Sequence, residues 1–197
     1  LNFTGPGTQM PATNEVIAEL EAMILQGSVE RRMGALEHLT SLFLSTSASA
    51  GESQIATFDE LFVSLSKGIE ASARQALAAR LADARHAPPK IVQDLASDDA
   101  IEVAEPILSR SECLDDKTII EIISSKSQKY LLAVSNRKSL SENVTDVLIG
   151  RGDRAVIHAT ARNDGAKFSD GGYKALVERS HGDEELAECV GSRPDIP

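Results

Sequence analysis

The first half of the sequence alternates between apolar patterns of helical period and short polar connectors. Apolar residues recur at helical spacing in residues 14–26 (NEVIAELEAMILQ), 27–44 (GSVERRMGALEHLTSLFL) and 54–69 (QIATFDELFVSLSKGI). Ser28 is a suitable N-cap for the second of these stretches. Residues 70–84 (EASARQALAARLADA) are rich in helix-forming residues and predict a fourth helix. The pattern indicates antiparallel helices joined by short loops.

The second half of the sequence contains a repeat. An apolar residue followed by a helix-opening pair recurs in steps of 27, 26 and 28 residues, at Ala87–Pro89 (APP), Leu114–Asp116 (LDD), Leu140–Glu142 (LSE) and Phe168–Asp170 (FSD). Ser and Asp cap the free amides of a first helical turn, and Pro fits the first helical position. Eight positions after each anchor stands an apolar residue, in order Leu95, Ile122, Leu148 and Leu176. A polar turn and a second apolar run complete each unit, which predicts two short helices per unit.

These patterns predict an all-α protein. We expect a right-handed, HEAT-like α-solenoid of short helix pairs that follows an N-terminal helical subdomain. The expected division is a flexible arm over 1–13, the subdomain over 14–86 and the repeats over 87–197, with units at 87–113, 114–139, 140–167 and 168–195. Pro106 lies inside the second helix of the first unit, where it removes one backbone hydrogen bond at a cost of about 3 kcal/mol, and predicts a kink or a restart of the helix.

Composition narrows the functional classes. The chain has a net charge of −10, so it gains nothing from the counterion release that drives nucleic-acid binding, and anionic membranes repel it. No run of 18 apolar residues is present, which excludes a membrane-spanning helix by the usual length criterion. Cys113 and Cys189 are far apart and form no CxxC motif, a usage that indicates two reduced thiols in a cytoplasmic protein.

The sequence contains no recognisable catalytic or metal-binding motif. Its four histidines form neither HxxxH nor HExxH, and neither SDD at Ser97 nor GDEE at Gly182 belongs to a twelve-residue calcium loop. No Gly-rich phosphate loop and no nucleophile elbow occurs. GRGD at Gly150 is explained as the turn between two repeat helices. We therefore expect no enzymatic activity, no cofactor and no metal ion.

Arginine recurs after the second helix of each unit, at Arg110, Arg137 and Arg162, with Arg193 in looser register. One explanation is favourable placement beside the negative C-terminus of a helix, which contributes about 0.3–1 kcal/mol each. The other is a row of donors along one edge that binds carboxylates of a partner. On the second explanation the partner-binding residues are Arg110, Arg137, Lys138, Arg162 and Asn163.

Three stretches resemble a known family: DDAIEVAEPILSRS, SQKYLLAVSNRKSLSENVTDVLIGRGD and LVERSHGDEELAECVGSRPDIP. They are similar to an uncharacterised, HEAT-like family of unknown function found mainly in alphaproteobacteria, over most of the chain from about Glu15. The resemblance implies an all-α repeat fold in a cytoplasmic bacterial protein and supplies no catalytic residues. One departure is the unit length, because ordinary HEAT units have about 40–47 residues.

The resemblance also bears on the C-terminal end. Family members continue past a motif like RPDIP, and the end of a solenoid needs a polar cap to stay soluble. We therefore expect that this chain is a fragment, or that its C-terminal face is covered by another molecule, including a second copy in a homo-oligomer.

A non-catalytic protein–protein interaction or regulatory scaffold is the function that the sequence supports best. The alternative is a small-molecule-binding sensor or a lyase-like chaperone, with a ligand between helices. For that alternative the candidate pocket residues are Tyr130, Tyr173 and the group Phe43, Phe58 and Phe62, although core packing explains the same residues. A HEAT-type nucleic-acid binder needs a basic stripe, which the net charge opposes.

Overall fold

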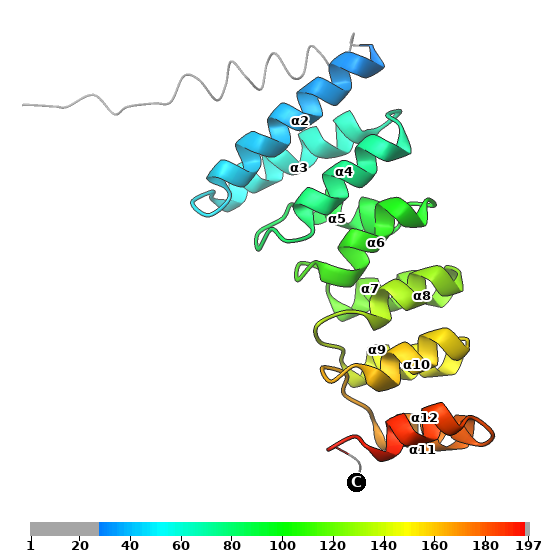
Figure 1. The fold of residues 1–197 in the computed structure, drawn as a ribbon. Coiled ribbons are helices and arrows are strands. Elements are labelled where there is room, and N and C mark those ends of the chain that lie inside the picture. The colour runs from blue at the N-terminus through cyan, green and yellow to red at the C-terminus, as the bar shows by residue number, and fades with distance from the viewer. Residues whose placement is uncertain (1–27, 196–197) are drawn as a thin grey trace, which may run out of the picture.

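The computed structural model describes residues 28–195 and shows helices joined by short loops (Figure 1). This part of the chain forms eleven α-helices, and its β-type pairing is limited to an isolated bridge between Leu140 and Ala166. The all-α prediction is therefore confirmed for residues 28–195. The predicted arm over 1–13 and the predicted helix over 14–26 lie outside the described residues.

The N-terminal part of the described chain contains α2 (Val29–Thr46), α3 (Glu52–Ser66) and α4 (Ala71–Leu81). Ser28 caps α2 as predicted, because its Oγ accepts a hydrogen bond from the N–H of Arg31. With 18 and 15 residues, α2 and α3 are longer than the helices that follow them.

Each of the four predicted units forms two short helices. The pairs are α5 (Pro89–Ala96) with α6 (Ile101–Arg110), α7 (Asp116–Ser125) with α8 (Gln128–Ser135), α9 (Glu142–Arg151) with α10 (Arg154–Arg162), and α11 (Asp170–Ser180) with α12 (Glu184–Gly191). The first helices of the last three pairs have the predicted N-caps, each of which accepts a hydrogen bond from the N–H three residues later: Asp115, Ser141 and Ser169.

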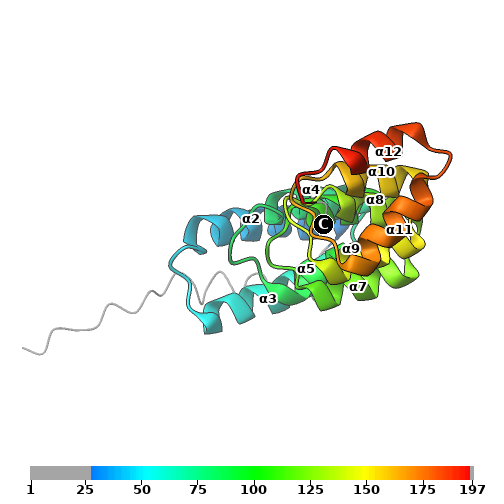
Figure 2. The same ribbon diagram turned by 90° about the horizontal axis from the view of Figure 1, so that it is seen from below.

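Successive pairs pack on one another in two layers (Figure 2). In one layer α4, α6, α8, α10 and α12 contact each other in that order. The other layer runs from α3 through α5, α7 and α9 to α11, and α9 contacts both α7 and α11. Helices of the same kind from neighbouring pairs therefore lie side by side, and the chain extends pair by pair (Figure 1).

The buried residues form one continuous core from Ala35 in α2 to Val190 in α12. The four positions predicted from the repeat are all buried, with exposed fractions of 6% or less: Leu95, Ile122, Leu148 and Leu176. Their burial follows from the helical period, because each lies on the face that its helix turns towards the second helix and the neighbouring pairs.

The start of α5 depends on a residue from another helix. Its N-cap is Pro88, which has no side-chain acceptor for the free amides of the first turn. Asp59 in α3 is buried and accepts hydrogen bonds from the N–H groups of Lys90 at 2.9 Å and Ile91 at 2.8 Å. A tertiary contact therefore supplies the cap that the local sequence lacks.

The expected restart at Pro106 is absent, since α6 is one helix from Ile101 to Arg110. Pro106 is buried, and the helix resumes its hydrogen bonding beyond it, with the N–H of Ser111 donating to the carbonyl of Ile107. The contacts of α6 with α4 and α8 on either side stabilise the helix against the loss of one backbone bond.

Candidate functional site

Of the predicted partner-binding residues, Arg137, Lys138 and Asn163 lie in the connectors that follow the second helices, whereas Arg110 and Arg162 are the last residues of α6 and α10. Two of these connectors run side by side, with the N–H of Leu140 donating to Gly165 O and the N–H of Lys167 donating to Leu140 O, both at 3.0 Å. A Cβ atom on Gly165 would lie 2.0 Å from the carbonyl oxygen of Lys138, so glycine is required for this close approach.

Arg137 is engaged within the protein. Its guanidinium donates to the carbonyls of Leu108 at 2.8 Å and Ser111 at 2.7 Å, at the C-terminus of α6. Burial lowers the pKa of Arg137, an effect that the nearby carboxylates of Asp116 and Glu112 oppose. The side chain therefore joins two neighbouring helix pairs.

Asn163 has the same role one pair later. Its Nδ2 donates to the carbonyls of Ser135 at 2.9 Å and Arg137 at 2.7 Å, while its Oδ1 accepts from the N–H of Gly165. The amide therefore binds the C-terminal end of α8 and is not free to contact a partner.

The same contact recurs at both ends of this series. Arg193, after α12, donates to the carbonyls of Ala161 and Asn163 at 2.8 and 2.9 Å. Arg110, the last residue of α6, reaches the carbonyl of Ala79 in α4 at 3.4 Å. Each donor thus binds the C-terminus of the preceding second helix, which is the negative end of the helix dipole. The first explanation therefore describes Arg137 and Arg193, although the helix concerned belongs to the neighbouring pair, whereas Arg162 pairs with Glu185 instead.

An equivalent set of contacts joins the first helices. Arg179 near the end of α11 donates to the carbonyls of Gly150 and Gly152, at 3.1 and 3.2 Å. Arg151 at the end of α9 donates to the carbonyl of Ile123 in α7. Both layers are therefore connected by basic side chains that bind the helix C-termini of the preceding pair.

The remaining predicted residues are exposed. Arg110 pairs with Asp83 at 3.1 Å, and Arg162 pairs with Glu185. Lys138 is exposed and, together with Arg110, lines a hollow of about 380 Å³. A second hollow of about 630 Å³ adjoins the first. Partner binding by Arg110, Lys138 and Arg162 stays a prediction.

An ion-pair cluster that the sequence did not reveal lies between α10 and α12. The Nε2 of His158 lies 2.8 Å from Asp183 Oδ2, and its Nδ1 lies 3.7 Å from Glu185 Oε2. The hydrogen bond from Arg154, together with that from His158, lowers the pKa of Asp183. The ligand atoms of His158, Asp183 and Glu185 are within 4.8 Å of one another, as in a metal site.

The charges of this cluster argue against a cation. Arg154 pairs with Asp183 at 2.7 Å and Arg162 pairs with Glu185, so each carboxylate already has a cationic partner. Asp183 also caps α12 through the N–H of Leu186. The arrangement holds α12 against α10, and His158 is missed in the sequence because its partners are 25 and 27 residues away.

The aromatic residues of the small-molecule hypothesis all lie in or against the hydrophobic core. Phe43 packs edge-on against Phe58 and Phe62, with ring centroids 5.2 and 5.9 Å apart, and these rings fill the space between α2 and α3. Tyr130 is buried and its hydroxyl donates to the carbonyl of Asp98 at 2.7 Å. Tyr173 is buried too and packs on Phe168, with ring centroids 5.3 Å apart, and its edge lines an open hollow.

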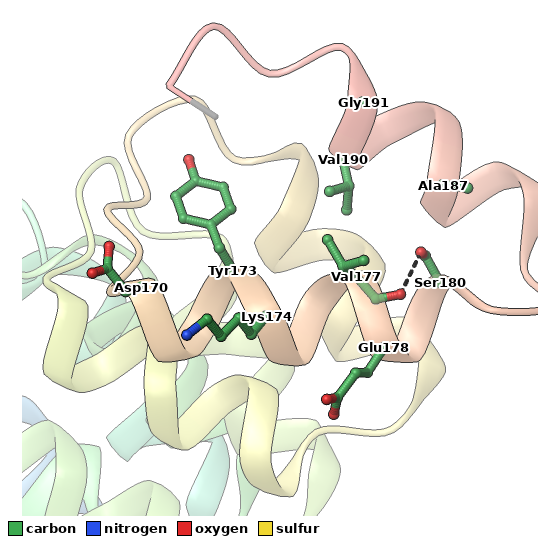
Figure 3. A pocket seen from close by; sticks show the side chains of 9 residues that line it. All are labelled: Asp170, Tyr173, Lys174, Val177, Glu178, Ser180, Ala187, Val190 and Gly191. Carbon is green, nitrogen blue, oxygen red and sulfur yellow. Dashed lines mark hydrogen bonds between the residues drawn. The ribbon is translucent and has the colours of Figure 1, made fainter. Parts of the chain in front are cut away.

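This hollow of about 800 Å³ lies on the outer side of the last helix pair (Figure 3). We call it the end surface, and its residues are Asp170, Tyr173, Lys174, Val177, Glu178, Ser180, Ala187, Val190 and Gly191. Val177 stands near its centre and is 49% exposed, a larger fraction than at Val29 or Leu132, the other exposed large apolar residues among residues 28–195.

The exposure of Val177 contrasts with the same position in earlier pairs. Val177 is the eighth residue after the N-cap of α11, and the eighth residues after the caps of α5, α7 and α9 are 0–1% exposed: Ala96, Ile123 and Ile149. Ala187, the fourth residue after the cap of α12, is likewise exposed. Its equivalents in the earlier second helices are buried: Ala104, Leu131 and Ile157.

Cys113 and Cys189 are both unpaired. Among residues 28–195, no helix combines the length and the apolar character needed to cross a membrane.

Comparison with known proteins gives one match. No curated protein and no solved structure is similar to the chain. The match to a family begins at Val103 in α6, a narrower range than the similarity expected from about Glu15. Residues 103–197 match the model of a family described as an uncharacterised protein conserved in bacteria (DUF2336).

Proposed function

We propose that this protein is a non-catalytic scaffold that binds another protein, and that its stacked helix pairs are a HEAT-like solenoid with the end surface as the main docking site. The single observation that carries the proposal is the exposure of Val177 at a position that is buried in each of the three preceding pairs. Covering such a side chain contributes about 1 kcal/mol or more to binding, in addition to the contacts around it.

The form of the surface supports a protein partner. The inner face of α11 and α12 continues the packing between pairs, so their outer face offers the shape that a further helix would fit. The edge residues Arg110, Lys138 and Arg162 belong to the proposal as secondary polar contacts, because they are exposed on the same scaffold.

The alternative of a small-molecule sensor has less support. Tyr130, Tyr173 and the three phenylalanines pack in or against the core, and the hollow that Tyr173 lines is open rather than an enclosed cavity. The proposal also includes the absence of enzymatic activity and a cytoplasmic location, both of which rest on the sequence pattern.

The proposal is tested by affinity capture from native lysate with three versions of the full chain. Val177→Asp places a charge on the end surface, and Leu132→Asp is the matched control, because Leu132 is an exposed apolar residue of α8 away from this surface. We expect a partner that is bound by the wild type and by Leu132→Asp and is lost with Val177→Asp. Equal capture by all three versions contradicts the proposed docking site.

A Lys138→Glu variant provides a separate arm of the experiment. Loss of the partner with this variant alone assigns binding to the edge and not to the end surface. Circular dichroism of each variant checks that the helices are intact, and Val177→Asp is expected to fold because the side chain already faces solvent.

A further inference from the structure

Helix α2 stands in the described part of the chain without a first helix before it. It lies in the layer of the second helices, because it contacts α4 as α4 contacts α6, whereas α3 contacts α5 in the other layer (Figure 2). Each later second helix follows a first helix across a turn of two to four residues. Within residues 28–195, α2 alone has no such partner.

Two apolar positions of α3 are less covered than in the later first helices. Ile55 and Phe58 are the fourth and seventh residues after the N-cap of α3, and both are half-buried. Each later first helix follows another helix in its layer, whereas α3 is the first one described. The residues at these two positions of the four later helices are all buried, with exposed fractions of 8% or less: Val92, Leu95, Ile119, Ile122, Thr145, Leu148, Tyr173 and Leu176.

The sequence before α2 repeats the pattern of a first helix. Thr13 is a suitable N-cap. Apolar residues stand three, four and seven positions after it, at Val16, Ile17 and Leu20. Residues 27–28 separate this segment from α2, and turns of the same length join α7 to α8 and α9 to α10. The same three positions after the caps of α5 and α9 are buried: Ile91, Val92, Leu95, Val144, Thr145 and Leu148.

An acidic residue of this segment has a described counterpart in α3. Asp59 is the eighth residue after the N-cap of α3, and it accepts hydrogen bonds from the first amides of α5, whose cap Pro88 has no side-chain acceptor. Glu21 is the eighth residue after Thr13. The next first helix is α3, whose N-cap Gly51 has no side chain. Glu21 therefore stands at the position from which Asp59 reaches the next first helix.

We propose that residues 14–26 are the first helix of the pair that α2 completes. The apolar face of this helix, with Leu20 at its centre, covers Ile55 and Phe58. The carboxylate of Glu21 accepts hydrogen bonds from the first amides of α3. At about 1.5 Å per residue the segment is about 20 Å long, close to the length of α3. The short turn before α2 keeps the helix on its own chain, and this contact is separate from the end surface.

Hydrogen exchange of the full chain, followed by mass spectrometry, tests the apolar contact. Leu20→Asp places a charge on the apolar face, and Ala18→Asp is the matched control, because the fifth position after the cap is exposed in α5, α9 and α11. In the wild type and the control we expect residues 16–24 to exchange at least about tenfold more slowly than an unfolded chain. Leu20→Asp should lose this protection and speed exchange in the first two turns of α3, while α9 stays unchanged.

A second pair of variants tests the cap. Glu21→Ala removes the acceptor, and Glu19→Ala is the control, because the sixth position after the cap is exposed in α5 and α7. We expect Glu21→Ala to speed exchange at the start of α3 severalfold while residues 16–24 stay protected. Glu19→Ala should change neither region.

Three results overturn the assignment in distinguishable ways. Rapid exchange of residues 14–26 in the wild type, or protection that Leu20→Asp leaves intact, removes the apolar contact with α3. A dimer in sedimentation experiments that Leu20→Asp abolishes, with protection that falls on dilution, shows that the segment packs on a second copy. Equal exchange at the start of α3 in Glu21→Ala and Glu19→Ala removes the capping role of Glu21.

Discussion

Replacing Arg137 by glutamine tests whether the repeated arginines hold the helix pairs together. Arg137 donates to the carbonyls of Leu108 and Ser111 at 2.8 and 2.7 Å, and glutamine is too short to keep both bonds. A hydrogen bond that involves a charged group contributes about 1.5–3 kcal/mol, and part of this is offset by the burial that lowers the pKa of Arg137. We therefore expect a loss of about 2–4 kcal/mol in the free energy of unfolding.

The matched control is Arg110→Gln. The side chain of Arg110 is 47% exposed and pairs with Asp83, which is 64% exposed, so its loss should cost less than about 1 kcal/mol. Urea unfolding followed by circular dichroism measures both variants, and the midpoint is compared at equal slope. A loss for Arg137→Gln no larger than that for Arg110→Gln refutes the structural role. Loss of partner capture at unchanged stability instead supports the explanation in which Arg137 binds the partner directly.

Three further predictions concern the caps and connectors. Asp59→Ala removes the buried acceptor for the first amides of α5 and should lower the free energy of unfolding by about 2–3 kcal/mol in urea melts. Asp183→Asn should destabilise the protein at neutral pH. Because the hydrogen bond from Arg154 lowers the folded-state pKa of Asp183, the stability it contributes is present above the unfolded pKa of about 3.9 and is lost as the pH falls below it. The difference between wild type and variant should therefore shrink in thermal melts below about pH 4, and a constant difference contradicts the ion pair. Gly165→Ala should destabilise the protein, because the new Cβ would lie 2.0 Å from a carbonyl oxygen. Gly150→Ala, which meets no atom within 4 Å in a helix, should stabilise it by about 0.5–1 kcal/mol, and equal melting temperatures for the two variants contradict the prediction.

Local chemistry explains how much of the architecture could be predicted. Ser141 and Ser169 cap helices because an N-cap acts on amides only three residues away, and this signal is visible in any sequence. Leu148 and Leu176 are buried because the helical period alone places them on the inner face. The repeat is also visible in the sequence, so the recurrence of basic residues around the ends of the second helices could be predicted.

The partners of these residues depended on packing between helices. Arg137 reaches carbonyls 26 and 29 residues away, and Asp59 caps a helix that starts 30 residues later. Which side chain meets which carbonyl is set by the offset between neighbouring pairs, a quantity that no local pattern contains.

The sequence by itself therefore determined the helices, their apolar faces and the starts that have local caps, because these arise from interactions within one or two turns. Only the tertiary structure decided that Arg137 and Asn163 bind inside the protein, and that Val177 is exposed although Ile149 at the same register position is buried. The physical reason is that burial of an outer helix face depends on the layer next to it. An apolar residue at this register position is therefore part of the core in α9 and part of the surface in α11.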